Sequence, residues 1–274
     1  MFDTVIEMLS YPFMTRAFLV GSLVALCSAL LGVSLVLKRY SMIGDGLSHV
    51  GFGAMAIAAA MNAAPLTVAI PVVIVAAILL LRISGNAKIK GDAAIALIST
   101  TSLAVGVMVI SLTTGMNTDV YNYMFGSILA MSAEDVKLSL VLSVCVLILF
   151  IVFYHKIFAI TFDETFARAT GVKAGVYNTL IAVLTAVTIV LGMRMMGALL
   201  ISSLIIFPAL TSMRVCRTFK SVIINAAIVS VVCLIAGVTL SYVAATPAGA
   251  SVVLANLVMM VLYTVVGAVK NHIR

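Results

Sequence analysis

Long apolar stretches alternate with short polar ones along the whole chain. A typical stretch is residues 141–153, which is nearly free of polar side chains on every face. A bilayer core of about 30 Å requires about 20 apolar residues in a helix, because the segment must satisfy its own backbone hydrogen bonds. A transmembrane β-barrel would instead show alternating polarity over about 10 residues per strand. The pattern therefore predicts membrane-spanning α-helices.

The hydrophobic pattern predicts an all-α, polytopic membrane bundle of about nine transmembrane helices, with eight as the alternative. Arg16 near the start of the first span, with no small-residue cleavage site behind it, indicates a retained helix rather than a signal peptide. No polar tract is long enough for a soluble domain, so residues 1–274 are expected to form one transmembrane domain. The expected spans are residues 13–37, 42–61, 64–81, 93–114, 136–154, 174–193, 197–213, 221–244 and 250–269.

Composition and charge add an orientation. The chain is 64% hydrophobic and 9% charged, whereas soluble domains carry about 25% charged residues. Of its 16 basic residues, all but Arg16, Lys137 and Arg194 fall in one alternate set of connections. Because cytoplasmic loops are enriched in Lys and Arg, the amino terminus is expected outside and the carboxyl terminus in the cytoplasm. The basic residues are scattered over separate short loops, so no nucleic-acid partner is expected.

An acidic residue and a histidine lie beside the second span, in KRYSMIGDGLSHVG (residues 38–51). Asp45 and His49 are at positions i and i+4, so in a helix they share one face. Ionisable side chains in a membrane span are costly and usually face a pathway or a partner. A simpler interpretation is that Asp45 caps a helix starting at Gly46, with His49 in its first turn. Spacing alone leaves both interpretations open.

Two connecting segments and two prolines also stand out. ITFDETFARATGVKAG (residues 160–175) predicts a short amphipathic helix that ends at Gly171. Such a helix suits docking into a groove on a soluble partner, although a solvated surface helix has the same pattern.

YNYMFGSILAMSAEDV (residues 121–136) predicts a short helix followed by the cap of the next span. Pro71 and Pro208 should each kink a span or be tolerated within it.

Five stretches together resemble the permease subunits of the bacterial ABC transporters that import manganese, zinc or iron. They occur in the family's order, cover almost the whole chain, and include SMIGDGLSHV as the most specific motif. The five stretches are KRYSMIGDGLSHVGFG, FGSILAMSAEDV, TFDETFARATGV, MRMMGALLISSLIIFPALTSMR and TPAGASVVLANLVMM.

This resemblance implies a fold, a set of partners and a cargo. The fold would be that of the ABC importer permeases of the vitamin B12, siderophore and metal type. The permease would form a homodimer in the bacterial cytoplasmic membrane, with two ABC ATPase subunits on the cytoplasmic face and a separate metal-binding protein outside. ATP hydrolysis would belong to the partner, so the chain itself would not be an enzyme. No cofactor would be bound permanently, and the cargo would be Zn²⁺, Mn²⁺ or Fe²⁺.

The resemblance also implies roles for individual residues. Asp45 and His49 would lie along the metal path. One carboxylate and one imidazole are too few ligands for a transition metal, but a two-fold dimer would bring two of each around one ion. The polar cytoplasmic segment would couple the permease to the ATPase through Phe162, Asp163, Glu164, Arg168 and Gly171.

Two other functional classes make demands that the sequence can be compared with. A secondary, ion-coupled metal transporter would need coupling-ion sites within the chain, usually in inverted repeats, and the sequence shows no internal repeat. An intramembrane metalloprotease would need a motif such as HExxH, which the sequence lacks. The ion-coupled transporter is kept as the alternative.

Overall fold

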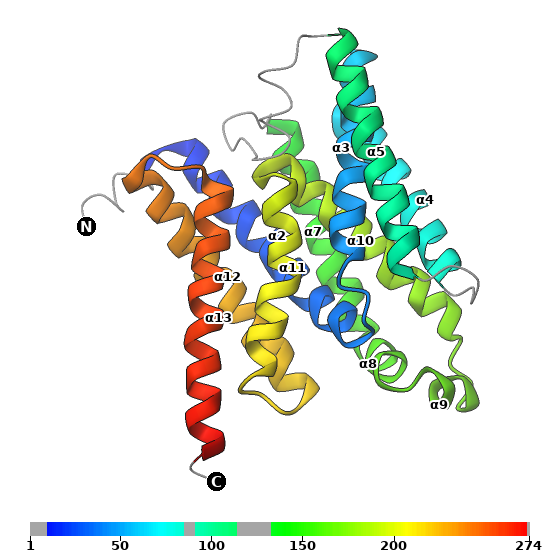
Figure 1. The fold of residues 1–274 in the computed structure, drawn as a ribbon, viewed down its shortest axis with the longest axis vertical. Coiled ribbons are helices and arrows are strands. Elements are labelled where there is room, and N and C mark those ends of the chain that lie inside the picture. The colour runs from blue at the N-terminus through cyan, green and yellow to red at the C-terminus, as the bar shows by residue number, and fades with distance from the viewer. Residues whose placement is uncertain (1–9, 85–90, 114–132, 273–274) are drawn as a thin grey trace.

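A bundle of long α-helices makes up the molecule (Figure 1). The computed structural model describes residues 10–84, 91–113 and 133–272, and every regular element within these ranges is an α-helix. The helices are α2 (Pro12–Leu37), α3 (Ile43–Ala60), α4 (Pro65–Ser84), α5 (Gly91–Thr113), α7 (Ala133–Val152), α8 (Tyr154–Phe162), α9 (Glu164–Ala169), α10 (Ala174–Met196), α11 (Ala198–Met213), α12 (Phe219–Ala244) and α13 (Ala248–His272).

Each of the nine expected spans corresponds to one long helix in this order. Eight helices among the described residues are long and apolar enough to cross a membrane, and α11, with 16 residues, is shorter. The prediction of an all-α bundle with eight or nine spans is therefore confirmed. Pro71 and Pro208 both lie inside continuous helices, α4 and α11, as the interpretation of tolerated prolines requires.

The expected ends differ from the observed ones by at most three residues, and Gly197, which was expected to begin a span, lies one residue before α11. Gly197 instead separates α10 from α11, and its φ of 86° lies in the left-handed region that favours glycine. The helix before it consequently runs on to Met196. A short helix was expected within residues 121–136, but positions 121–132 lie outside the described residues. The rest of that segment, from Ala133 onward, is the start of α7.

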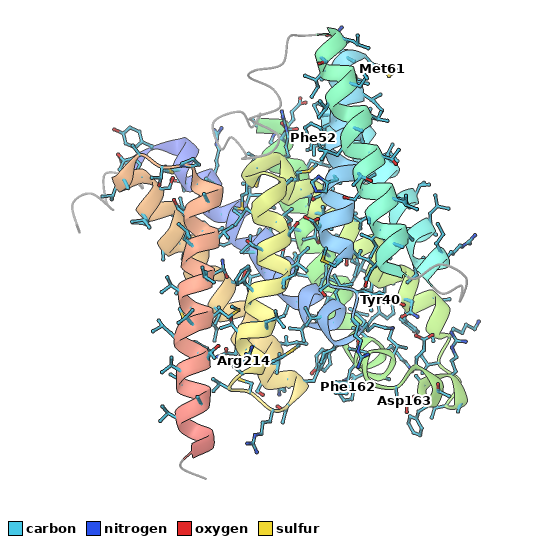
Figure 2. The ribbon with its side chains drawn as sticks, viewed as in Figure 1. Tyr40, Phe52, Met61, Phe162, Asp163 and Arg214 are labelled. Carbon is cyan, nitrogen blue, oxygen red and sulfur yellow. The ribbon has the colours of Figure 1, made fainter. Side chains whose placement is uncertain are left out.

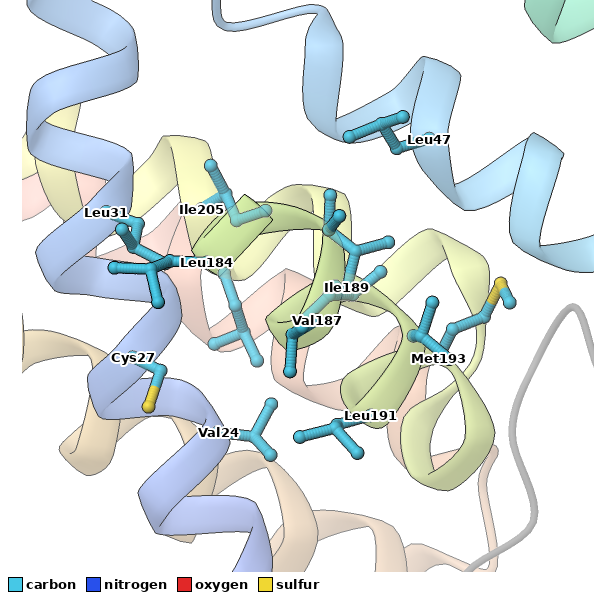
Figure 3. Close-up of a cluster of buried hydrophobic side chains, with 14 of the residues drawn as sticks. Val24, Cys27, Leu31, Leu47, Leu184, Val187, Ile189, Leu191, Met193 and Ile205 are labelled. Atoms are coloured by element: carbon cyan, nitrogen blue, oxygen red, sulfur yellow. The ribbon is translucent and has the colours of Figure 1, made fainter. Parts of the chain in front are cut away.

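The helices form an inner and an outer group. The buried share of the membrane-crossing stretch is 67% in α2, 72% in α3 and 67% in α10. In α7 and α13 the buried share is only 22% and 17%. Figure 3 shows one part of the inner packing, in which Val24 and Leu31 of α2 and Leu184 and Leu191 of α10 belong to one cluster of buried side chains. The helix that carries Asp45 and His49 therefore belongs to the inner group.

The connections that follow α2, α8 and α11 lie towards the same end of the bundle. Figure 2 shows Tyr40, Asp163 and Arg214 in its lower part and Met61 at its top. The short helices α8 and α9 are thus placed at the end from which α3 starts.

Candidate functional site

Asp45 lies in the first turn of α3 rather than in front of it. The helix begins at Ile43, its N-cap is Met42, and no side chain caps it. The interpretation of Asp45 as the cap of a helix starting at Gly46 is therefore wrong, because the helix starts earlier than the glycine suggests. A carboxylate in the first turn still interacts favourably with the positive end of the helix dipole.

Asp45 and His49 form a pair whose spacing fits a shared metal ion. Asp45 Oδ2 and His49 Nε2 are 3.7 Å apart. Two ligand atoms about 2.1 Å from a tetrahedral ion are separated by roughly 3.4 Å, so a small rotation of either side chain would let both bind one ion. The side chain of Asp45 is 46% exposed and that of His49 is 22% exposed. The pair is thus open on one side of a single chain.

The glycines on either side of Asp45 let two other helices approach it. A Cβ atom at Gly46 would lie 2.7 Å from Ile95 Cγ2 of α5, and one at Gly44 would lie 3.2 Å from Ile205 Cδ1 of α11. Both distances are shorter than ordinary packing contacts. The GDG sequence therefore places the carboxylate where α3 passes between α5 and α11.

Ser202 on α11 also contacts the candidate site. Its hydroxyl can donate to Asp45 Oδ1 at 3.4 Å or to Ala198 O of its own helix at 3.3 Å, while Ser48 Oγ donates to the backbone carbonyl of Asp45 at 2.7 Å. Ser202 was not singled out from the sequence. The signal that could have singled it out is the polar pair SS in the otherwise apolar stretch LLISSLII.

One chain does not provide a complete transition-metal site within its described part. No group of three or more His, Cys, Asp or Glu side chains that could hold a metal occurs among the described residues. Zinc and similar ions take about four N, O or S donors in protein sites. The open side of Asp45 must therefore receive further ligands if the pair holds an ion.

The predicted cytoplasmic segment contains two short helices instead of one. Asp163 separates α8 from α9 with extended backbone angles, and its Oδ1 accepts a hydrogen bond from the Phe166 N–H at 2.9 Å. Phe162 consequently belongs to the end of α8. Gly171 has φ 86° just after α9, so the expected glycine terminator is present.

The two short helices expose aromatic and charged side chains. Phe162 and Phe166 are 59% and 65% exposed, and the side chain of Arg168 is 65% exposed. Ala167 faces the opposite way and is fully buried. The exposed face of α9 therefore has the mixture of apolar and charged groups that a protein-binding helix presents.

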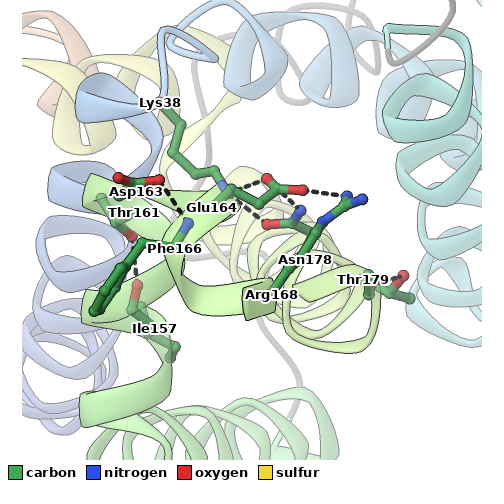
Figure 4. A network of polar contacts seen from close by, with 10 residues as sticks. Lys38, Ile157, Thr161, Asp163, Glu164, Phe166, Arg168, Asn178 and Thr179 are labelled. Carbon is green, nitrogen blue, oxygen red and sulfur yellow. Dashed lines mark hydrogen bonds and ion pairs between the residues drawn. The ribbon is translucent and has the colours of Figure 1, made fainter. Parts of the chain in front are cut away.

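Glu164 faces the bundle, unlike Phe166 and Arg168. Figure 4 shows its carboxylate receiving hydrogen bonds from Lys38 at the end of α2, from Asn178 of α10 and from Arg168. Burial by itself raises the pKa of Glu164, but the hydrogen bonds from Asn178 and Arg168 and the charge of Lys38 outweigh it, so the pKa is lowered. Sequence reasoning counted Lys38 only as a topology charge and did not single out Asn178.

Known proteins are similar to this chain in sequence and in fold over nearly its whole length. ZnuB, the high-affinity zinc uptake system membrane protein of Haemophilus influenzae, is 31% identical over 246 residues, which cover 90% of this chain and 94% of the relative. The manganese transport system membrane protein MntC of Halalkalibacterium halodurans is 27% identical over 248 residues, covering 90% and 85%. The structure of PsaBC from Streptococcus pneumoniae in complex with Fab matches with a TM-score of 0.86 at 27% identity, covering 96% of this chain and 95% of that one.

The profile of the ABC 3 transport family matches residues 10–267. The resemblance inferred from the five motifs is therefore confirmed, and the ion-coupled transporter is not supported. The protein is a multi-pass membrane protein that works with an ATPase in one complex. The chain belongs to the ABC 3 transport family and is the permease of an ABC metal-ion importer, in which a separate subunit hydrolyses ATP.

Proposed function

We propose that residues 1–274 form a single permease domain that works as a homodimer and passes one Zn²⁺ or Mn²⁺ ion at a time between two copies of the Asp45–His49 pair. The observation that carries the proposal is the 3.7 Å spacing of Asp45 Oδ2 and His49 Nε2 beside an open side of the chain. A two-fold axis there would supply two carboxylates and two imidazoles. Binding by side chains that stay partly exposed would be weak enough for release, as transport requires.

The donor set supports either metal. Carboxylate and imidazole ligands bind zinc, manganese and ferrous iron, and geometry and supply decide between them more than affinity does. The relatives described above are named for zinc and for manganese. A probable iron transport system membrane protein of Haemophilus influenzae is 33% identical over 244 residues, so Fe²⁺ is a third candidate cargo.

The partners follow from the two ends of the bundle. In the proposal, the exposed aromatic side of α8 and α9 docks on the cytoplasmic ATPase, with Phe162 and Arg168 at the contact and Asp163 and Gly171 fixing the ends of α9. A separate metal-binding protein delivers the ion from outside. The amino terminus lies outside and the carboxyl terminus in the cytoplasm, which agrees with the distribution of basic residues.

Metal uptake into proteoliposomes tests the proposal. The permease is reconstituted with its ATPase and binding protein, and uptake of labelled zinc and manganese is measured for the wild type, Asp45→Ala and His49→Ala. Each substitution removes two of four ligands, because the dimer doubles every change, so uptake should be abolished. His155→Ala, which changes an exposed histidine on α8, should transport normally. Wild-type uptake by both Asp45→Ala and His49→Ala would contradict the proposed site.

A further inference from the structure

Lys38 connects the start of α3 to α9 without belonging to either helix. It is the C-cap of α2, and its backbone N–H donates to Ser34 O. Its ammonium group reaches the Glu164 carboxylate at 3.4 Å and also donates to Asn178 Oδ1. Lys38 thus bonds to the first residue of α9 and to the first turns of α10 at once (Figure 4).

The turn between Lys38 and Asp45 is short and hydrogen-bonded. Arg39 has a left-handed φ of 62°, the Tyr40 N–H donates to Leu35 O at 2.8 Å, and the Ile43 N–H donates to Tyr40 O at 3.0 Å. A non-glycine residue in the left-handed region is held there only by such surrounding contacts. Hydrogen bonds thus join the end of α2, where Lys38 lies, to the first turn of α3, where Asp45 lies.

The ion pair is nearly buried at its Lys38 end and partly exposed at its Glu164 end. The side chain of Lys38 is only 10% exposed and that of Glu164 is 33% exposed. Burial lowers the pKa of Lys38, and the charge and hydrogen bond of Glu164 oppose that shift. Removing Glu164 would leave the nearly buried Lys38 ammonium without its carboxylate, whereas removing Lys38 would leave Glu164 with hydrogen bonds from Arg168 and Asn178 only.

We infer that Lys38 and Asn178 are positioning residues that link the movement of α9 to the metal-binding end of α3. The inference rests on the proposed function, and it divides the coupling segment into two sides. Phe166 and Arg168 face outward, where a partner can hold them, and Glu164 faces inward onto Lys38 and Asn178. When the ATPase moves α9, the Glu164–Lys38 contact moves the α2–α3 turn, and Asp45 moves with it.

The test is the number of metal ions transported per ATP hydrolysed by the complete reconstituted importer. Lys38→Met keeps the length of the side chain and removes its charge. We expect it to leave basal ATP hydrolysis and assembly unchanged and to lower the ratio of metal to ATP about fivefold or more, the size of an ordinary coupling between two sites. Lys38→Arg, which keeps the charge, should restore most of the ratio. Lys156→Met, an exposed lysine on α8 for which the described residues show no ion pair, should not change it.

Asn178→Leu provides an independent measurement if Lys38→Met fails to assemble. This substitution removes the donor to Glu164 and the acceptor for Lys38, so it should lower the same ratio. A wild-type ratio in Asn178→Leu, or a proportional loss of ATP hydrolysis and transport in both variants, would overturn the inference. Failure of the proposed function would look different, since Asp45→Ala would then transport metal at the wild-type rate.

Discussion

Asp45 carries a negative charge at a position where its surroundings already favour one. It lies in the first turn of α3, where the helix dipole contributes about 0.3–1 kcal/mol to an anion, and Ser202 can donate a hydrogen bond to it. These interactions offset part of the cost of holding a carboxylate within a membrane span. A divalent cation can offset the rest, so the same features that tolerate the charge also suit the proposed binding role.

Substitution of Ser202 tests the orientation of that carboxylate. Ser202→Ala removes the hydrogen bond to Asp45 Oδ1, and loss of an outer partner of a metal ligand typically weakens metal binding about tenfold or more. We therefore expect a KM for metal uptake about tenfold higher, with little change in the maximal rate.

Ser203→Ala is the matched control for this measurement. Ser203 is the neighbouring residue, it is buried, and its hydroxyl donates to Leu200 O of its own helix. An equal rise of the KM in both variants would show that the effect comes from the packing of α11 and not from the contact with Asp45.

At the scale of single elements, α3 can pack close to α5 because Gly46 has no side chain. Gly46→Ala would place a methyl group 2.7 Å from Ile95 Cγ2, and overpacking of this kind costs about 1–3 kcal/mol. The thermal unfolding midpoint of the detergent-solubilised permease should therefore fall.

Ile95→Ala provides the compensating change. The double variant Gly46→Ala/Ile95→Ala should be more stable than the sum of the single effects predicts, because the methyl group then has space. Gly175→Ala is the control, since no atom lies within 4 Å of its added Cβ atom. Additive effects of Gly46→Ala and Ile95→Ala would mean that this contact does not limit the approach of α3 to α5.

The helices themselves could be predicted from the sequence, because each span requires a long apolar run whatever its neighbours are. The ends were less predictable. The apolar pattern predicts a break between residues 193 and 197, and the structure places it at Gly197, so that α10 runs on to Met196. From the sequence, Asp163 could lie inside a helix or at its N-cap. The hydrogen bond that the Phe166 N–H donates to Asp163 Oδ1 shows that Asp163 is the N-cap of α9.

At the scale of the whole molecule, the orientation in the membrane can be tested at two connections that lie at opposite ends of the bundle. Asn62 follows α3 and Thr170 follows α9, and both are exposed. In a variant without its four native cysteines, a cysteine at position 62 should react with a membrane-impermeant reagent added outside intact cells. A cysteine at position 170 should react only after permeabilisation. The reverse pattern would invert the orientation, and labelling of both from one side would contradict the order of the spans.

At the site, the contacts between residues far apart in the sequence could not be predicted. Asp45 and His49 could be placed on one face from their spacing alone, since both lie on one helix. The partner of Asp45 is Ser202, 157 positions away, and the partner of Lys38 is Glu164, 126 positions away. No local pattern links such residues, because the packing of whole helices brings them together.

Metal stoichiometry tests the central claim most directly. Equilibrium dialysis of the assembled permease–ATPase complex against labelled zinc, at saturating concentrations, gives the number of ions bound per permease chain. A site shared across a two-fold axis predicts one ion for every two chains, and loss of that ion in Asp45→Asn, which keeps the shape of the side chain but not its charge. One ion per chain, or the same binding by Asp45→Asn, would contradict a site built from two Asp45–His49 pairs.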